Sequence, residues 1–112
     1  MSLHLSLLIL FVAAVLEVGG DALIRTGLHA PTALSRTVFF LFGALVLFVY
    51  GYVVNAPPWD FSKLLGVYVV FFFIATQLIS LLVFHARPSV STLIGGAFIV
   101  VGGVIMFIGD LR

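Results

Sequence analysis

The sequence predicts an all-α integral membrane protein, a bundle of four transmembrane helices. Composition is the first reason: of 112 residues, 63% are hydrophobic and 8% are charged, which leaves no polar surface for a soluble globule. The second reason is the length of the apolar runs, each close to the roughly 20 residues that cross about 30 Å of hydrocarbon. Four such runs fill the chain, near residues 3–24, 34–54, 62–84 and 88–109.

Short connections separate the four runs, and they contain helix breakers such as Pro31, Pro57 and Pro88. Connections of this length make consecutive helices antiparallel neighbours, so we expect residues 1–112 to form a single domain. Four helices enclose little space and cannot by themselves shield buried acids from lipid. We therefore expect a dimer.

The first run carries three charged residues at four-residue spacing, Glu17, Asp21 and Arg25. In a helix they lie one turn apart on one flank. A carboxylate near mid-membrane costs about 2.5 to 3.5 kcal/mol, so it usually faces a cavity, a partner or a water path. Low dielectric disfavours the charged form, and we expect Glu17 to bind and release protons, with cation and proton competing for it.

Asp21 has two interpretations. As the i,i+4 neighbour of Arg25 it can serve as the counter-ion of that residue, while the Arg25 side chain extends to the membrane interface. Alternatively it binds substrate directly beside Glu17. The sequence leaves both open.

The aromatic residues Tyr50, Tyr52 and Trp59 lie near the end of the second run. Tyrosine and tryptophan are enriched where a membrane meets water. We expect these three to anchor the helix at the interface.

The third run begins with Asp60 and Lys63 and carries Tyr68 deeper. An acid in a first turn is typical of interaction with the helix dipole. Tyr68 has two interpretations: its hydroxyl donates a hydrogen bond to Glu17 across the bundle, or it is satisfied locally within a packed core.

The fourth run has two glycine series at seven-residue spacing, Gly95, Gly102 and Gly109, with Gly96 and Gly103 one position later. Small residues on one stripe let membrane helices approach closely. We expect Gly95 and Gly102 to form a dimer interface; packing within one chain is the alternative.

The positive charges are nearly balanced between the two sides of the membrane. Lys63 and Arg112 lie on the side of the N-terminus, against Arg25, Arg36 and Arg87 on the other. This weak bias is compatible with insertion in both orientations, although a weak bias can also fix a single one.

No pattern indicates an enzyme. The chain contains no nucleophile with its base, no phosphate-binding loop and no dinucleotide fingerprint. It has no cysteine, and its three histidines lack metal-ligand spacing. We expect no cofactor, no metal and no nucleic-acid partner.

Residues 14–25, AVLEVGGDALIR, resemble the first helix of the small multidrug resistance transporters, with their single membrane glutamate at Glu17. Pro88 followed by Gly95 and Gly102 is similar to their fourth helix, and the resemblance covers essentially the whole chain. It implies an antiparallel homodimer of dual topology in the bacterial inner (plasma) membrane. The two glutamates of such a dimer would exchange protons for a cationic substrate.

The chain also departs from those transporters. Phe61 aligns with their active-site tyrosine and Leu64 with a tryptophan, while Gly66 keeps the glycine. By this alignment Phe61 is the ring we expect against a bound cation, with Lys63 as polar support. Residues 65–69, LGVYV, are similar to the YnfA-like branch of the superfamily.

The sequence therefore predicts a proton-coupled exporter of small cationic or amphipathic solutes, with Glu17, Asp21, Phe61 and Tyr68 at its binding site. The alternative is a non-transporting membrane subunit that docks on a partner through a buried network of Glu17, Asp21 and Arg25. A heteromer with a similar chain is also compatible with the sequence.

Overall fold

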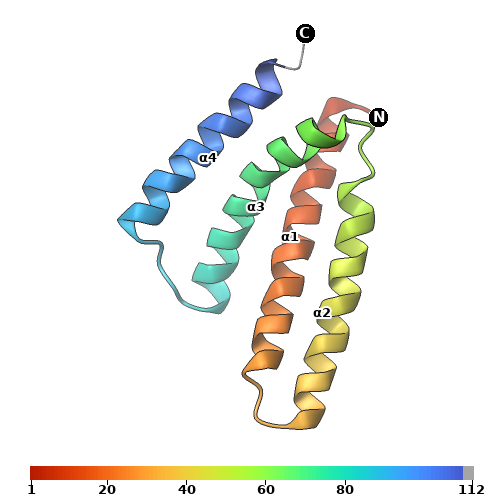
Figure 1. Cartoon of the computed structure of the whole chain (residues 1–112), viewed down its shortest axis with the longest axis vertical. Coiled ribbons are helices and arrows are strands. Elements are labelled where there is room, and N and C mark those ends of the chain that lie inside the picture. The colour runs from red at the N-terminus through yellow and green to blue at the C-terminus, as the bar shows by residue number, and fades with distance from the viewer. Residues whose placement is uncertain (110–112) are drawn as a thin grey trace.

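The computed structural model describes residues 1–109 and is helical throughout (Figure 1). Each helix is long and apolar enough to cross a membrane, which confirms the predicted fold class. Arg112, part of the charge comparison above, lies outside the described residues. The helices are α1 (Leu3–Leu28), α2 (Ala33–Val54), α3 (Phe61–Val83) and α4 (Val90–Gly109).

Two helix ends differ from the approximate apolar runs, the end of α1 by four residues and the start of α4 by two. α1 continues to Leu28, so Arg25 lies in its last turn. α4 begins at Val90. The Ser89 hydroxyl accepts a hydrogen bond from the backbone N–H of Thr92 at 3.1 Å and caps the first turn.

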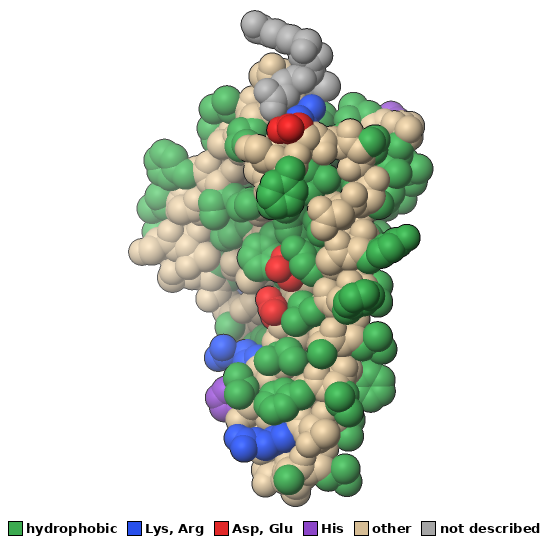
Figure 2. Space-filling model, turned by 45° about the vertical axis from the view of Figure 1, so that its right-hand side comes forward, with side chains coloured by type: hydrophobic (Ala, Val, Ile, Leu, Met, Phe, Trp, Pro, Cys, Tyr) green, Lys and Arg blue, Asp and Glu red, His purple; other side chains and the backbone are tan. Residues whose placement is uncertain are grey.

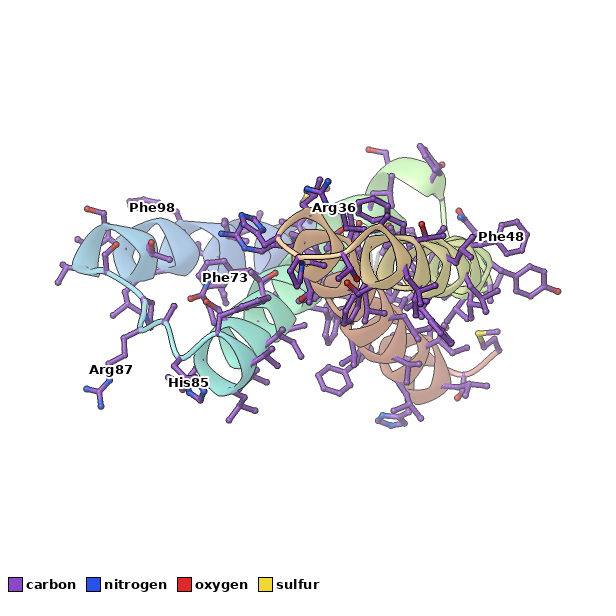
Figure 3. The ribbon with its side chains drawn as sticks, turned by 90° about the horizontal axis from the view of Figure 1, so that it is seen from below. Arg36, Phe48, Phe73, His85, Arg87 and Phe98 are labelled. Carbon is purple, nitrogen blue, oxygen red and sulfur yellow. The ribbon has the colours of Figure 1, made fainter. Side chains whose placement is uncertain are left out.

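The four helices form two antiparallel hairpins joined through α1 and α3 (Figures 1 and 3). In residues 1–109, the backbones of α1 and α2, of α1 and α3, and of α3 and α4 approach one another closely. The molecule measures 53 × 34 × 19 Å with a radius of gyration of 15.6 Å, against about 13 Å for a compact chain of this length. It is a flat layer that leaves the faces of α2 and α4 open.

Close backbone approach sets the register of α1 against α2. A Cβ atom on Gly20 would lie 2.7 Å from Leu47 Cδ2, and one on Gly43 would lie 2.7 Å from Ile24 Cδ1. Only glycine accommodates both neighbours. The register places the middle of α1, with Glu17, beside the second half of α2.

The two glycine series of α4 face different surroundings. A Cβ atom on Gly96 would collide with the Phe73 ring, and one on Gly103 with the Val70 side chain, so this series packs against α3. Nothing lies within 4 Å of the corresponding positions on Gly95 and Gly102. Gly96 and Gly103 therefore belong to the interior of the chain, and Gly95 and Gly102 lie on its open face.

The buried apolar core joins α1 to α3. Leu10, Ala13 and Ala14 of α1 are completely buried, against Leu64 and Val67 of α3 among others. This apolar cluster fills the N-terminal half of α1. Glu17 lies one turn past it, where the packing opens.

Candidate functional site

Glu17, Asp21 and Arg25 share one flank of α1, as the spacing predicted, because the helix runs unbroken to Leu28. Glu17 is half-buried and Asp21 is exposed. Figure 2 shows acidic side chains at mid-height among hydrophobic ones, basic side chains below them, and further acidic and basic side chains near the upper end. The acidic side chains at mid-height thus occupy the depth at which a membrane protein would otherwise present only apolar groups.

Glu17 has a specific partner on another helix. The Tyr68 hydroxyl of α3 donates a hydrogen bond to Glu17 Oε1 at 2.8 Å. The Tyr68 side chain is only 4% exposed, so its hydroxyl would otherwise have no water to bond. Of the two interpretations of Tyr68, the structure therefore supports the one in which its hydroxyl bonds Glu17 across the bundle.

Aromatic rings line the same region. The centroid of the Tyr50 ring lies 5.9 Å from that of Tyr68, and the centroid of Phe72 lies 6.3 Å from it. Tyr50, which was expected to anchor α2 at the membrane interface, packs half-buried against Tyr68. Its spacing of seven residues from Gly43, the contact point with α1, is the signal that could have identified it.

A groove between α1 and α3 begins at Val18, the residue after Glu17, and Glu17 itself does not line it. Its volume is about 470 Å³, and its polar lining residues are Asp21, Arg25, Thr76 and Ser80. Phe72 and Phe84 contribute aromatic surface. We call it the α1–α3 groove.

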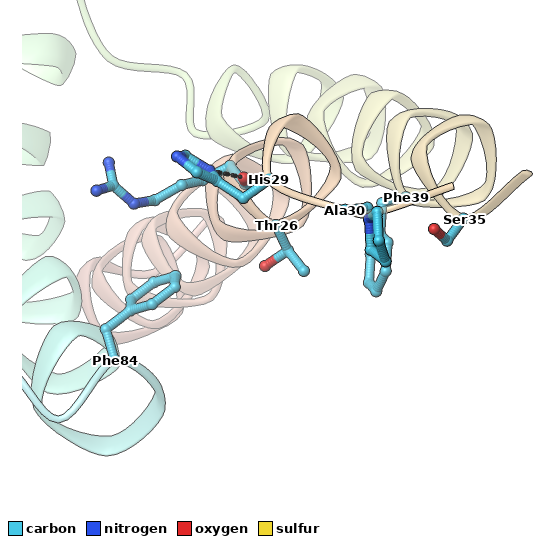
Figure 4. A pocket seen from close by; sticks show the side chains of 8 residues that line it. Thr26, His29, Ala30, Ser35, Phe39 and Phe84 are labelled. Carbon is cyan, nitrogen blue, oxygen red and sulfur yellow. Dashed lines mark hydrogen bonds between the residues drawn. The ribbon is translucent and has the colours of Figure 1, made fainter. Parts of the chain in front are cut away.

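A second cavity of about 480 Å³ lies where the connection between α1 and α2 turns (Figure 4). Arg25 and Phe84 line both cavities. The Arg25 guanidinium lies 5.9 Å from the centroid of the Phe84 ring, in cation–π range. His29 is held beside it by a hydrogen bond of 2.9 Å between its Nδ1 and the Arg25 carbonyl oxygen.

Asp21 and Arg25 do not form an ion pair. Within residues 1–109, no Lys, Arg or His nitrogen lies within 4.0 Å of an Asp or Glu oxygen. Asp21 is therefore not the counter-ion of Arg25 in this structure, because the guanidinium lies against Phe84 instead. Both charges remain available to a ligand.

Phe61 and Lys63 lie elsewhere. Phe61 is the first residue of α3 and is 68% exposed, two helical turns from Tyr68. Lys63 Nζ lies 4.9 Å from the centroid of the Trp59 ring and 5.9 Å from that of Phe107. Within one chain neither residue joins the group around Glu17.

The chemistry available to this site is that of carboxylates and hydroxyls. In the described part of the chain, no group of three His, Cys, Asp or Glu residues is placed to hold a metal ion. Glu17 keeps one carboxylate oxygen free of the Tyr68 bond, since a carboxylate has about four acceptor positions. That oxygen can take a proton or a cationic group.

Comparison with known families gives one match. The family described as "Uncharacterised BCR, YnfA/UPF0060 family" matches residues 3–112. Searches among curated proteins and among solved structures found no match. The matched range includes every residue of the site described above.

Proposed function

Since the chain belongs to the YnfA/UPF0060 family, a branch of the small multidrug resistance superfamily, we propose that this integral membrane protein is a proton-coupled exporter. Its substrates are small cationic or amphipathic solutes. Glu17 exchanges a proton for the substrate, with Asp21 and Tyr68 beside it. The proposed location is the bacterial plasma membrane.

The observation that carries this proposal is the bond between Glu17 and Tyr68. A mid-membrane carboxylate is costly, and here no ion pair offsets the cost within residues 1–109. A single neutral donor at 2.8 Å orients the carboxylate and leaves its second oxygen open. A fixed carboxylate with an open coordination position is what exchange between a proton and a cation requires.

Coupling follows from competition. A proton and a cationic group cannot both occupy the Glu17 carboxylate, so each leaves when the other arrives. If the proton and the substrate stabilise conformations that open to opposite sides of the membrane, exchange needs no further component. Export then runs on the proton gradient.

A second copy completes the proposed assembly. The open face of α4 carries Gly95 and Gly102, which leave room for another helix. We propose an antiparallel homodimer in which the two α4 helices pack through this face and bring two Glu17 residues to one site. A heteromer with a similar chain would use the same face.

The docking-subunit alternative has less support. It needs Glu17, Asp21 and Arg25 to form one buried network, yet Glu17 bonds Tyr68 on α3 while Arg25 lies against Phe84. No ion pair joins the three in the described residues.

The test is capacitive current from proteoliposomes on a solid support. Wild type and Glu17→Gln are challenged with guanidinium, quaternary ammonium and polyaromatic cations at two pH values, with Asp60→Asn as the matched control, an exposed acid at the start of α3. We expect currents in wild type and Asp60→Asn that vanish in Glu17→Gln. Silence in folded wild-type protein across the panel would favour the docking subunit or a missing partner chain.

A further inference from the structure

The α1–α3 groove holds two opposite charges that do not satisfy each other. Asp21 and Arg25 are four residues apart on α1, a spacing at which opposite charges usually attract. Both line the groove, yet their charged atoms are more than 4.0 Å apart. A carboxylate with about four acceptor positions and a guanidinium with five donors therefore face the same space without a bond between them.

The Arg25 side chain is held away from Asp21 by a neighbour. Its guanidinium lies 5.9 Å from the centroid of Phe84, beyond the end of α3. Cation–π contact uses the face of the guanidinium and leaves its N–H edge free to bind an acceptor. Arg25 is thus positioned as an anion-binding group at the end of the groove.

The remaining wall is mostly apolar. Val18, Ala22, Phe72 and Ile79 line the groove together with the hydroxyl-bearing residues Thr76 and Ser80. The Thr76 hydroxyl already donates to the Phe72 carbonyl oxygen at 2.7 Å. A volume of about 470 Å³ falls in the range of small-molecule sites, which combine apolar walls with a few polar groups.

The charges follow a fixed order along α1: negative at Glu17, negative at Asp21 and positive at Arg25, each about 6 Å of helix rise from the next. A simple cation bound at Asp21 would have the Arg25 charge beside it and would therefore bind less tightly than a solute that also carries an anionic group. A solute with a cationic group and an anionic group would satisfy both ends.

From this order we infer that the α1–α3 groove binds amphipathic zwitterions. The cationic group lies at the Asp21 carboxylate, the anionic group lies on the Arg25 guanidinium, and the apolar body packs against Phe72 and Phe84. This inference names a substrate class for the proposed transport function and rests on that function for coupling to Glu17. Binding itself is tested without transport.

The experiment measures equilibrium binding to purified protein for two pairs of solutes that differ in the anionic group: glycine betaine with choline, and phenylalanine with phenethylamine. We expect the zwitterion of at least one pair to bind about tenfold or more tightly than its cation, the effect of one charge-assisted hydrogen bond. Arg25→Gln should remove this preference, and Asp21→Asn should weaken both members of the pair. Arg25→Lys, which keeps the charge, should retain part of it.

The control is Arg87→Gln, an arginine in the connection between α3 and α4 that does not line the groove (Figure 3). It should bind like wild type, and every variant should elute as a single folded species. Cations that bind as tightly as zwitterions in both pairs, an unchanged ratio in Arg25→Gln, or no binding of either zwitterion to folded wild type would overturn the inference. A preserved preference without Glu17-dependent currents would instead refute only the proposed transport.

Discussion

Glu17 and its hydrogen bond to Tyr68 are the centre of the site at the residue scale. The spacing on α1 predicted Glu17, because an acid in an apolar run has few uses other than function. Tyr50 was not found in this way, since a tyrosine near the end of a span is equally typical of the interface. The difference depends on the rotation of α2 about its axis, which a uniformly apolar sequence does not encode.

The hydroxyl of Tyr68 can be removed without changing the ring. Tyr68→Phe should lower Glu17-dependent transport by about tenfold to a hundredfold, since a hydrogen bond to a charged group contributes about 1.5 to 3 kcal/mol. Initial rates of proton-coupled currents measure the effect. Tyr52→Phe is the matched control, because Tyr52 is 79% exposed. Wild-type rates in Tyr68→Phe would show that the bond has no part in transport.

At the scale of elements, the two glycine series of α4 separate packing within the chain from packing between chains. Gly103→Leu places a branched side chain against Val70, and overpacking of this kind costs about 1 to 3 kcal/mol. Gly102→Leu meets open space. We expect Gly103→Leu to lower the thermal stability of the fold, and Gly102→Leu to keep the fold and lose the dimer.

Thermal unfolding and light scattering in detergent measure these two outcomes. Dimers of wild-type strength in Gly102→Leu would show that the chain associates through another face. Unfolding of both variants together would show that the two series are not distinct.

The end of α3 depends on a residue in an unusual conformation. His85 has φ of 54°, a left-handed backbone that costs a non-glycine residue roughly 1 to 2 kcal/mol. His85→Gly should raise the free energy of unfolding by about 0.5 to 1 kcal/mol after the entropy of glycine is deducted. Circular dichroism on heating measures it. His29→Gly, at φ of −106°, has no such strain to relieve and should not stabilise the protein.

At the scale of the whole molecule, insertion of the chain into the membrane in both orientations remains a prediction. The described chain is flat, with uncovered faces on α2 and α4, and near-balanced charges allow both insertions. The chain has no cysteine, so a single introduced thiol is a unique label. Ala56 and Ala86 are exposed and lie in the connections that follow α2 and α3, on opposite sides of the membrane.

An impermeant maleimide applied to sealed vesicles should label about half of Ala56→Cys and about half of Ala86→Cys, because a balanced bias inserts both ways. The remainder should react only after the vesicles are opened. Complete labelling of one variant and none of the other would establish a single orientation and contradict the antiparallel dimer.

The sequence alone determined the four spans and the charged flank of α1. A bilayer requires every backbone polar group to be hydrogen-bonded within the protein, and apolar runs of about 20 residues meet this as helices. The helical period then places Glu17, Asp21 and Arg25 together. Only the tertiary structure decided that Tyr68 bonds Glu17, that Tyr50 packs against Tyr68, and that Arg25 does not pair with Asp21. The physical reason is that in a membrane both the lipid-facing and the core-facing sides of a helix are apolar. Hydrophobic periodicity therefore carries no signal for helix rotation, and close packing at a few glycines sets it.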